Sequence, residues 1–79
     1  MDRIIVAFRG EETRRRILRL LALEGREGVP CAGGAEALRA VRRLGGGVVI
    51  CGFYLSDMTA TALAEDLRGL ALVLVVAQA

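Results

Sequence analysis

The residues that could do chemistry in this chain gather around one stretch, residues 47–60. Its first part, residues 48–51, is a short apolar run rich in β-branched side chains and without alternation, which predicts a strand buried on both faces. Gly52, two aromatic residues and a polar turn at residues 56–59 follow it. Because open α/β sheets place their sites in the loops that follow buried strands, we expect a site here.

Two sets of side chains near this expected site have both a functional and a structural interpretation. Arg9, beside Gly10 and a predicted helix start, offers a guanidinium and backbone N–H groups to an anion or to an acidic side chain of a partner. The alternative is a solvated loop arginine. Phe53 and Tyr54 either shape a shallow pocket with Gly52 or pack over an empty site.

The composition excludes several classes of function. The net charge of +2 comes from eleven arginines against nine acids without a long basic run, so it does not by itself indicate nucleic-acid binding. The chain has no histidine, and Cys31 and Cys51 lack metal-ligand spacing, so we expect no metal and no cofactor. Both cysteines lie among apolar residues, which predicts buried thiols; a redox sensor at Cys51 is the alternative, if its thiol is exposed and its pKa lowered.

The N-terminus and the apolar segments indicate a cytoplasmic chain without a membrane partner. Residues 1–3 lead directly into a short apolar run, which differs from a signal peptide. No apolar segment approaches the roughly 20 residues that a membrane span needs.

Short apolar runs alternate with helical periodicities along the whole chain. Strands are predicted at residues 4–8, 28–32, 48–51 and 70–76, and helices at residues 11–24, 35–44 and 60–67. Pro30 cannot donate to a strand ladder, which predicts that the second strand is an edge strand or a short one. The resulting order, βαβαβαβ, predicts an α/β fold with a parallel sheet between helices on both faces, in three αβα layers.

Local patterns add detail to the helices. In the first helix, Ile17, Leu20 and Leu21 follow at helical spacing and are predicted to lie in the inner stripe. The four arginines at positions 14, 15, 16 and 19 are interpreted as a solvated face, with i,i+4 pairs from Glu11 to Arg15 and from Glu12 to Arg16. Gly25 is a plausible C-cap of this helix, and Asp57 or Thr59 could cap the third helix.

The last predicted strand, residues 70–76, is apolar throughout and would need cover on two faces. At a sheet edge, such a strand is prone to association with other chains. We therefore expect either a domain truncated after its fourth strand, which we favour, or a partner that covers this strand. Residues 1–79 would then form a single partial domain without an output domain.

Three stretches resemble the receiver domain of bacterial two-component response regulators, which has the flavodoxin-like (CheY-like) fold. Residues 3–7 resemble its first strand. Residues 32–38, AGGAEAL, resemble its "A-x-G-x-E-A-L" entry to the second helix, and residues 55–60, LSDMTA, resemble the "L-P-D-M-D-G" that follows its phosphorylated aspartate. The resemblance implies the strand order 2-1-3-4, with the final helix, strand and helix of the family missing.

The same resemblance predicts that the usual phosphoryl chemistry is lost. Phosphorylation of such a domain needs a carboxylate nucleophile and two acids that hold Mg²⁺. The resemblance places Gly52 at the phosphoacceptor position and Phe8 and Arg9 at the acidic pair, while the expected alcohol falls near Ala77. Residues 47–56 contain no acid, and Asp57 matches the loop acid of the motif.

The resemblance therefore implies a degenerate receiver, or pseudo-receiver, that is not an enzyme. Such modules act by docking to a partner protein or by self-association, usually in front of a transcription or antitermination output domain, which would supply any contact with nucleic acid. Two alternatives stay open. One is a small anion or nucleotide binding module that uses the strand-end crevice around Arg9 and Gly52; the other is a phosphoacceptor that uses Asp57. The possible ligand or partner contacts are Arg9, Gly10, Phe53, Tyr54 and Asp57.

Overall fold

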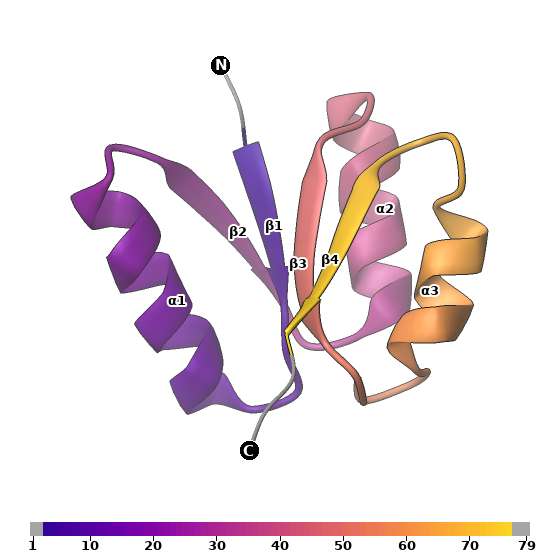
Figure 1. The fold of residues 1–79 in the computed structure, drawn as a ribbon, viewed down its shortest axis with the longest axis horizontal. Coiled ribbons are helices and arrows are strands. Elements are labelled where there is room, and N and C mark those ends of the chain that lie inside the picture. Colours follow the sequence, from indigo (N-terminus) through magenta and orange to yellow (C-terminus); the bar gives the residue numbers. More distant parts are fainter. Residues whose placement is uncertain (1–2, 77–79) are drawn as a thin grey trace.

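The computed structural model describes residues 3–76, which form four strands and three helices in strict alternation (Figure 1). The elements in chain order are β1 (Arg3–Ala7), α1 (Glu11–Leu23), β2 (Glu27–Cys31), α2 (Gly34–Leu44), β3 (Val48–Gly52), α3 (Ala60–Asp66) and β4 (Leu72–Val76). The predicted βαβαβαβ order is confirmed.

The four strands form one parallel sheet in the order β2-β1-β3-β4. In this sheet, β1 pairs with β2 from Arg3↔Glu27 and with β3 from Ile4↔Val48, while β3 pairs with β4 from Val48↔Leu72. The predicted strand order is confirmed. Pro30 lies in β2, which is an edge strand of the sheet. A proline, which has no backbone N–H, is tolerated at such an edge because one side of the strand has no neighbouring strand.

One face of the sheet is packed against α2 and α3 (Figure 1). Its core combines side chains from β1 and β3 with Val41 of α2 and with Leu63 and Leu67, which are all at most 1% exposed. Residues 4–7 of β1 and 48–51 of β3 are apolar throughout because both faces of the sheet are covered at these two strands. The other face carries α1, which completes the three layers.

On the α1 face, fewer side chains are buried than on the face that packs against α2 and α3. Ile17, Leu18 and Leu21 of α1, together with Ile50 of β3, pack against the buried side chains of Ile4, Val6 and Phe8. The predicted position of Leu20 in this inner stripe is wrong, because its side chain is 57% exposed. A helix that covers only part of a sheet face buries a narrow stripe, and Leu20 lies beyond its edge.

Most predicted boundaries agree with the structure to within one residue, and β4 is the largest difference. It begins at Leu72 and not at residue 70, because the N–H groups of Leu70 and Ala71 donate to the Leu67 carbonyl in the turn after α3. The predicted local contacts are present. Glu11–Arg15 and Glu12–Arg16 approach to 3.2 and 3.5 Å, Gly25 has a φ of 72°, and the Thr59 hydroxyl accepts the Ala62 N–H.

None of the helices within residues 3–76 has the length and apolar character needed to cross a membrane.

Candidate functional site

The carboxyl ends of β1 and β3 lie side by side and open into a hollow of about 390 Å³. Its lining is Phe8, Arg9, Gly10, Thr13, Gly52, Phe53 and Tyr54. Six of these seven are residues that the sequence singled out. Thr13 was missed, although its place one helical turn after Gly10 could have indicated it.

Phe8 and Gly52 are in close contact at the centre of this site. The Phe8 side chain is 2% exposed. A Cβ atom built on Gly52 would lie 3.0 Å from Phe8 Cδ1 and 3.3 Å from Cε1, which is tighter than ordinary van der Waals contact. The Phe8 ring therefore occupies the space into which a side chain at position 52 would extend.

Arg14 fixes the loop that follows β1. Its Nη1 donates to the Phe8 carbonyl at 2.6 Å and to the Arg9 carbonyl at 3.1 Å, and its backbone N–H donates to the Gly10 carbonyl. Arg14 thus differs from the solvated helix arginine that the sequence predicted. A charged donor on two carbonyl groups is a strong contact, so the loop is held by a cation of the chain itself.

The two aromatic residues lie at the rim of the hollow. Phe53 and Tyr54 pack edge to face, with ring centroids 4.8 Å apart and planes at 86°. Their side chains are 46% and 67% exposed. Phe8, and not either of these rings, fills the space beside Gly52.

Asp57 serves a different part of the molecule. Its Oδ1 accepts the Gly34 N–H at 2.7 Å and its Oδ2 accepts the Ala35 N–H at 3.1 Å, both at the start of α2. These backbone hydrogen bonds lower the pKa of the Asp57 carboxyl. Asp57 was proposed as a cap of α3, but that role belongs to Thr59, while Asp57 caps α2.

Comparisons with known proteins identify the architecture. No family model matches the sequence, and no curated protein matches it significantly. A solved structure of a CheY-like response regulator receiver domain from Methylobacillus flagellatus superposes with a TM-score of 0.85. The match covers 98% of this chain and 70% of that one, at 21% identity. This chain has the receiver fold.

The receiver fold implies a Mg²⁺ ion at the carboxyl ends of the strands, but the residues present do not fit one. The lining of the hollow offers the Arg9 guanidinium and the Thr13 hydroxyl, and it includes no carboxylate. Mg²⁺ in proteins is held by carboxylate oxygens, and the Arg9 cation would repel it. Among the described residues, no group of three or more Asp, Glu, His or Cys side chains is placed to hold a metal.

The remaining predicted site positions lie elsewhere. Ala77, the position expected for an alcohol at the end of β4, lies outside the described residues. Cys31 and Cys51 are buried as predicted, and burial raises the pKa of both thiols. A buried thiol with a raised pKa is a poor nucleophile, which favours a structural role for Cys31 and Cys51 over a redox role.

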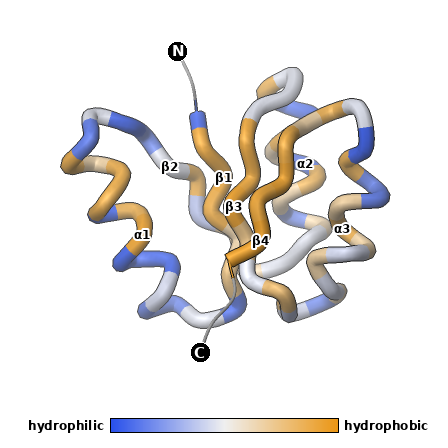
Figure 2. The backbone as a smooth tube through the Cα atoms, viewed as in Figure 1, coloured by the Kyte–Doolittle hydropathy of each residue, from blue (hydrophilic) through white to orange (hydrophobic). Residues whose placement is uncertain are grey.

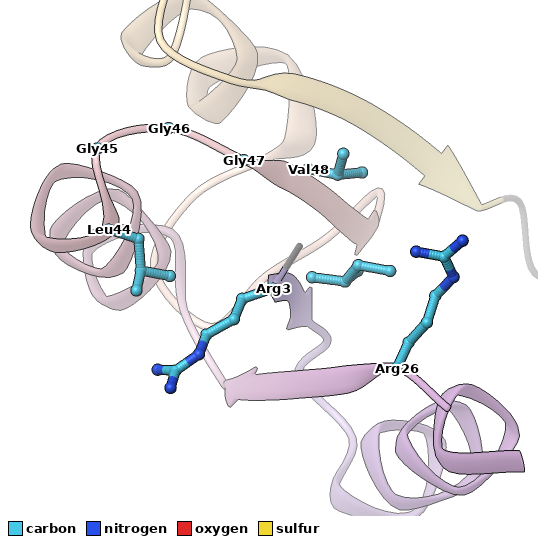
Figure 3. Close-up of a pocket in the computed structure, with 8 residues that line it drawn as sticks. Arg3, Arg26, Leu44, Gly45, Gly46, Gly47 and Val48 are labelled. Atoms are coloured by element: carbon cyan, nitrogen blue, oxygen red, sulfur yellow. The ribbon is translucent and has the colours of Figure 1, made fainter. Parts of the chain in front are cut away.

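A second hollow, of about 380 Å³, lies at the opposite, amino ends of the strands (Figure 3). Arg3, Arg26 and the loop Gly45–Gly47 contribute to its lining. The two arginine side chains point in different directions (Figure 3). Arg3 Nε also pairs with Glu27 Oε1 at 3.1 Å. The two cations therefore do not converge on one point, and the receiver fold places its site at the other end of the sheet.

Proposed function

We propose that this chain is a non-catalytic receiver-like module, a pseudo-receiver that transmits a signal by docking to a partner protein or by dimerisation. The observation that carries the proposal is the contact between Phe8 and Gly52. In a receiver that accepts phosphate, the position of Gly52 holds the acceptor carboxylate. Here a buried aromatic ring takes the space of that side chain.

The charges around the site support the same proposal. Arg9 lies in the lining, and the Arg14 guanidinium is bound to the carbonyls of Phe8 and Arg9. Two cations of the chain therefore stand close to where a phosphorylated receiver would hold Mg²⁺. A loop held in this way does not depend on a metal or a phosphoryl group for its conformation.

Asp57 is a poor candidate for an alternative phosphoacceptor. Both of its oxygens accept backbone N–H groups at the start of α2, and Asp57 does not appear in the lining of the hollow. Hydrogen bonds that stabilise the carboxylate and lower its pKa also make its oxygens weaker nucleophiles. We therefore assign Asp57 to the fold and expect phosphoryl donors to leave it unmodified.

The target of the module is proposed from the resemblance to receivers and not from the geometry of the site. Receiver domains of this degenerate type usually control a nucleic-acid-binding domain, in transcription or antitermination. We propose an output of that kind, with the contacts to nucleic acid made outside this domain.

The proposal is tested by incubating the chain with acetyl phosphate and Mg²⁺ and measuring its intact mass. A receiver that retains its acceptor aspartate serves as the positive control. We expect no phosphoryl adduct on the wild type or on Gly52→Asp, because Phe8 still occupies the space beside position 52. An adduct on the wild type would contradict the proposal, and peptide mapping would show whether Asp57 carries it.

The second candidate function is binding of a small anion in the same hollow, which the Arg9 guanidinium and the Thr13 hydroxyl favour. Titration with inorganic phosphate, followed by amide NMR shifts, tests this candidate. Binding would shift residues 8–13 and 52–54 in the wild type and not in Arg9→Gln. An absence of shifts for phosphate and for a panel of nucleotides would exclude it.

A further inference from the structure

The two loops around the hollow at the carboxyl ends of β1 and β3 are each fixed by a charged side chain that does not line it. Arg14 Nη1 donates to the carbonyls of Phe8 and Arg9, at 2.6 and 3.1 Å, in the loop after β1. The Asp57 carboxylate accepts two backbone N–H groups, at 2.7 and 3.1 Å, and so ties the loop after β3 to the start of α2. Both walls of the hollow are therefore preorganised before anything binds.

The loop between β3 and α3 is also closed by contacts of its own. The Ala60 N–H donates to the Phe53 carbonyl at 2.7 Å, and Tyr54 and Thr59 form an antiparallel bridge. Leu55 is 6% exposed and anchors this loop in the core. The backbone that carries Phe53 and Tyr54 is thus held by contacts in which neither ring takes part.

Three side chains on this fixed frame are not needed to hold it. Phe53 and Tyr54 are 46% and 67% exposed, and they are two of the three aromatic residues of the chain. Arg9 is also exposed and takes part in none of the ion pairs found within residues 3–76. Phe, Tyr and Arg are enriched in protein interfaces, so an exposed group of all three around a preformed hollow indicates a contact with another molecule.

The lining of the hollow combines a positive charge with apolar surface and includes no carboxylate. The Arg9 guanidinium and the Thr13 hydroxyl can both donate to an oxygen anion, and guanidinium–carboxylate pairs are frequently bidentate. Phe8 adds an aromatic ring, while Gly10 and Gly52 let another molecule approach the backbone closely. Figure 2 shows the apolar strands of the sheet running into loops of mixed hydropathy. The hollow therefore fits a group that is anionic at one point and apolar beside it.

We propose that this hollow is the docking site of the module and that it takes an acidic side chain, with an adjacent apolar side chain, from a partner protein. The inference rests on the proposed function and names the surface through which the module docks. The acidic group pairs with Arg9 and Thr13, and the apolar group packs on Phe53 and Tyr54. A protein segment fits better than a free phosphate ion, because a small anion at the guanidinium leaves both rings exposed.

The place and size of the hollow define the kind of segment that docks. The hollow lies over the two central strands of the sheet, which pair along residues 4–7 and 48–51. Its volume of about 390 Å³ is near the lower end of the roughly 300–1,000 Å³ found for binding pockets. We therefore expect it to take one or two side chains of a short segment, with weak affinity for that segment alone.

A set of capped dipeptides tests the proposal on the full 79-residue chain. The reference peptide has an aspartate followed by a phenylalanine. One control peptide replaces the aspartate with asparagine, and the other replaces the phenylalanine with alanine. Amide NMR titration is expected to give a dissociation constant of about 1 mM for the reference peptide, with shifts at residues 8–13 and 52–54. Each control peptide is expected to bind at least about fivefold more weakly.

Substitutions in the chain assign each half of the peptide to one wall of the hollow. Arg9→Gln should remove the preference for aspartate over asparagine and keep the preference for phenylalanine over alanine. Tyr54→Ala should do the opposite. Arg39→Gln removes an exposed arginine of α2 that does not line the hollow, and this matched control should change neither preference. The dispersion of the amide spectrum shows that each variant is folded.

Three results would overturn the proposal. The first is an absence of amide shifts at about ten times the expected dissociation constant. The second is equal binding of the phenylalanine and alanine peptides with competition by inorganic phosphate, which would assign the hollow to small anions alone. The third is a pair of preferences that survive both Arg9→Gln and Tyr54→Ala, which would place the contact elsewhere on the chain.

The acetyl phosphate experiment separates this inference from the proposed function. An absence of both peptide binding and a phosphoryl adduct leaves the pseudo-receiver proposal intact and removes this docking site. A phosphoryl adduct on the wild type removes the proposed function, whether or not the reference peptide binds.

Discussion

The two faces of the sheet differ in how completely they are covered. Against α2 and α3, the inward side chains of β1 and β3 are fully buried, in a cluster of twelve buried residues. Against α1, the corresponding cluster holds three, Ile4, Val6 and Phe8, and Leu72 and Leu74 of β4 are 59% and 47% exposed. In β1, β3 and β4, nearly all the residues that point to either face of the sheet are apolar. The difference in cover between the two faces therefore does not come from the composition of these strands.

The difference follows from the topology. The crossover from β1 to β2 moves in one direction along the sheet, whereas the later crossovers to β3 and β4 move in the other. Right-handed crossovers in opposite directions place their helices on opposite faces. Within residues 3–76, one helix therefore packs on the α1 face and two pack on the other, so the strand order decides which face each of these helices covers.

The largest expected difference between the faces is in thiol reactivity. Cys31 and Cys51 are buried in the α2 and α3 face, and burial raises their pKa, so little thiolate is present. Leu74 of β4 is 47% exposed. We expect the thiol of Leu74→Cys to react with a disulfide reagent on the order of a hundredfold faster than Cys31 or Cys51, measured on dilute protein at neutral pH. Equal rates would contradict the assigned burial, and denaturant should make all three thiols react alike.

Truncation of one leucine on each face should give the largest difference in folding stability. Leu63 is fully buried against β3, while Leu72 is 59% exposed. We expect Leu63→Ala to lower the free energy of unfolding by about 2–5 kcal/mol and Leu72→Ala by less than about 0.5 kcal/mol. Urea denaturation of dilute protein measures both changes. Similar losses of unfolding free energy for the two variants would show that Leu72 is covered in solution.

The Phe8–Gly52 contact joins β1 to β3 on the α1 face. Gly52→Ala is expected to cost about 1–3 kcal/mol, because the new Cβ would lie 3.0 Å from the Phe8 ring. A Phe8→Leu background should relieve part of that cost, which a double-mutant cycle of urea melts measures. Gly10→Ala is the control, since its Cβ would meet Thr13 Oγ1 at an ordinary 3.7 Å. A cost that is the same in both backgrounds would argue against the contact.

Asp57→Asn tests the opposite face with the smallest expected effect. The hydrogen bonds from Gly34 and Ala35 lower the folded pKa of Asp57, so its ionised form stabilises the folded chain. That contribution is fully present above the unfolded pKa of about 3.9 and is lost as the pH falls through the lowered folded value. The thermal midpoint of Asp57→Asn should therefore lie below that of the wild type at neutral pH, and the gap should close in acid.

The matched control for Asp57 is Asp66→Asn, an exposed acid at the end of α3. We expect this variant to show no comparable loss at neutral pH. A gap for Asp57→Asn that persists in acid would mean that the carboxylate charge is not what holds α2.

Much of the fold was predictable because its signals are local. Buried strands appear as apolar runs, Pro30 marks an edge, and the Glu11–Arg15 pair lies one helical turn apart. The strand order came from the resemblance to receivers, since periodicity carries no information on order. Leu20 could not be placed, because its exposure depends on how much of the sheet α1 covers.

The site was predicted less completely because its contacts are distant in sequence. The positions of Phe8 and Gly52 were identified, but their contact joins β1 to β3. Asp57 was expected to act within its own loop, and it caps a helix that begins 23 residues earlier. Arg14 resembled its neighbours in α1, and only the course of the loop after β1 shows that its guanidinium binds two carbonyls.

The pairing of β1 with β3 also has a consequence for how the chain acquires its structure. Ile4 and Val48 are 44 positions apart, so the central ladder closes a long segment before it gains any hydrogen bond. Parallel sheets of this kind fold slowly for their size, because nearly every ladder is non-local. On the ribosome, β1 and β2 can pair early, but β1 stays exposed on its other edge until residue 48 has emerged. The delay leaves that edge of β1 open to pairing with other chains during synthesis.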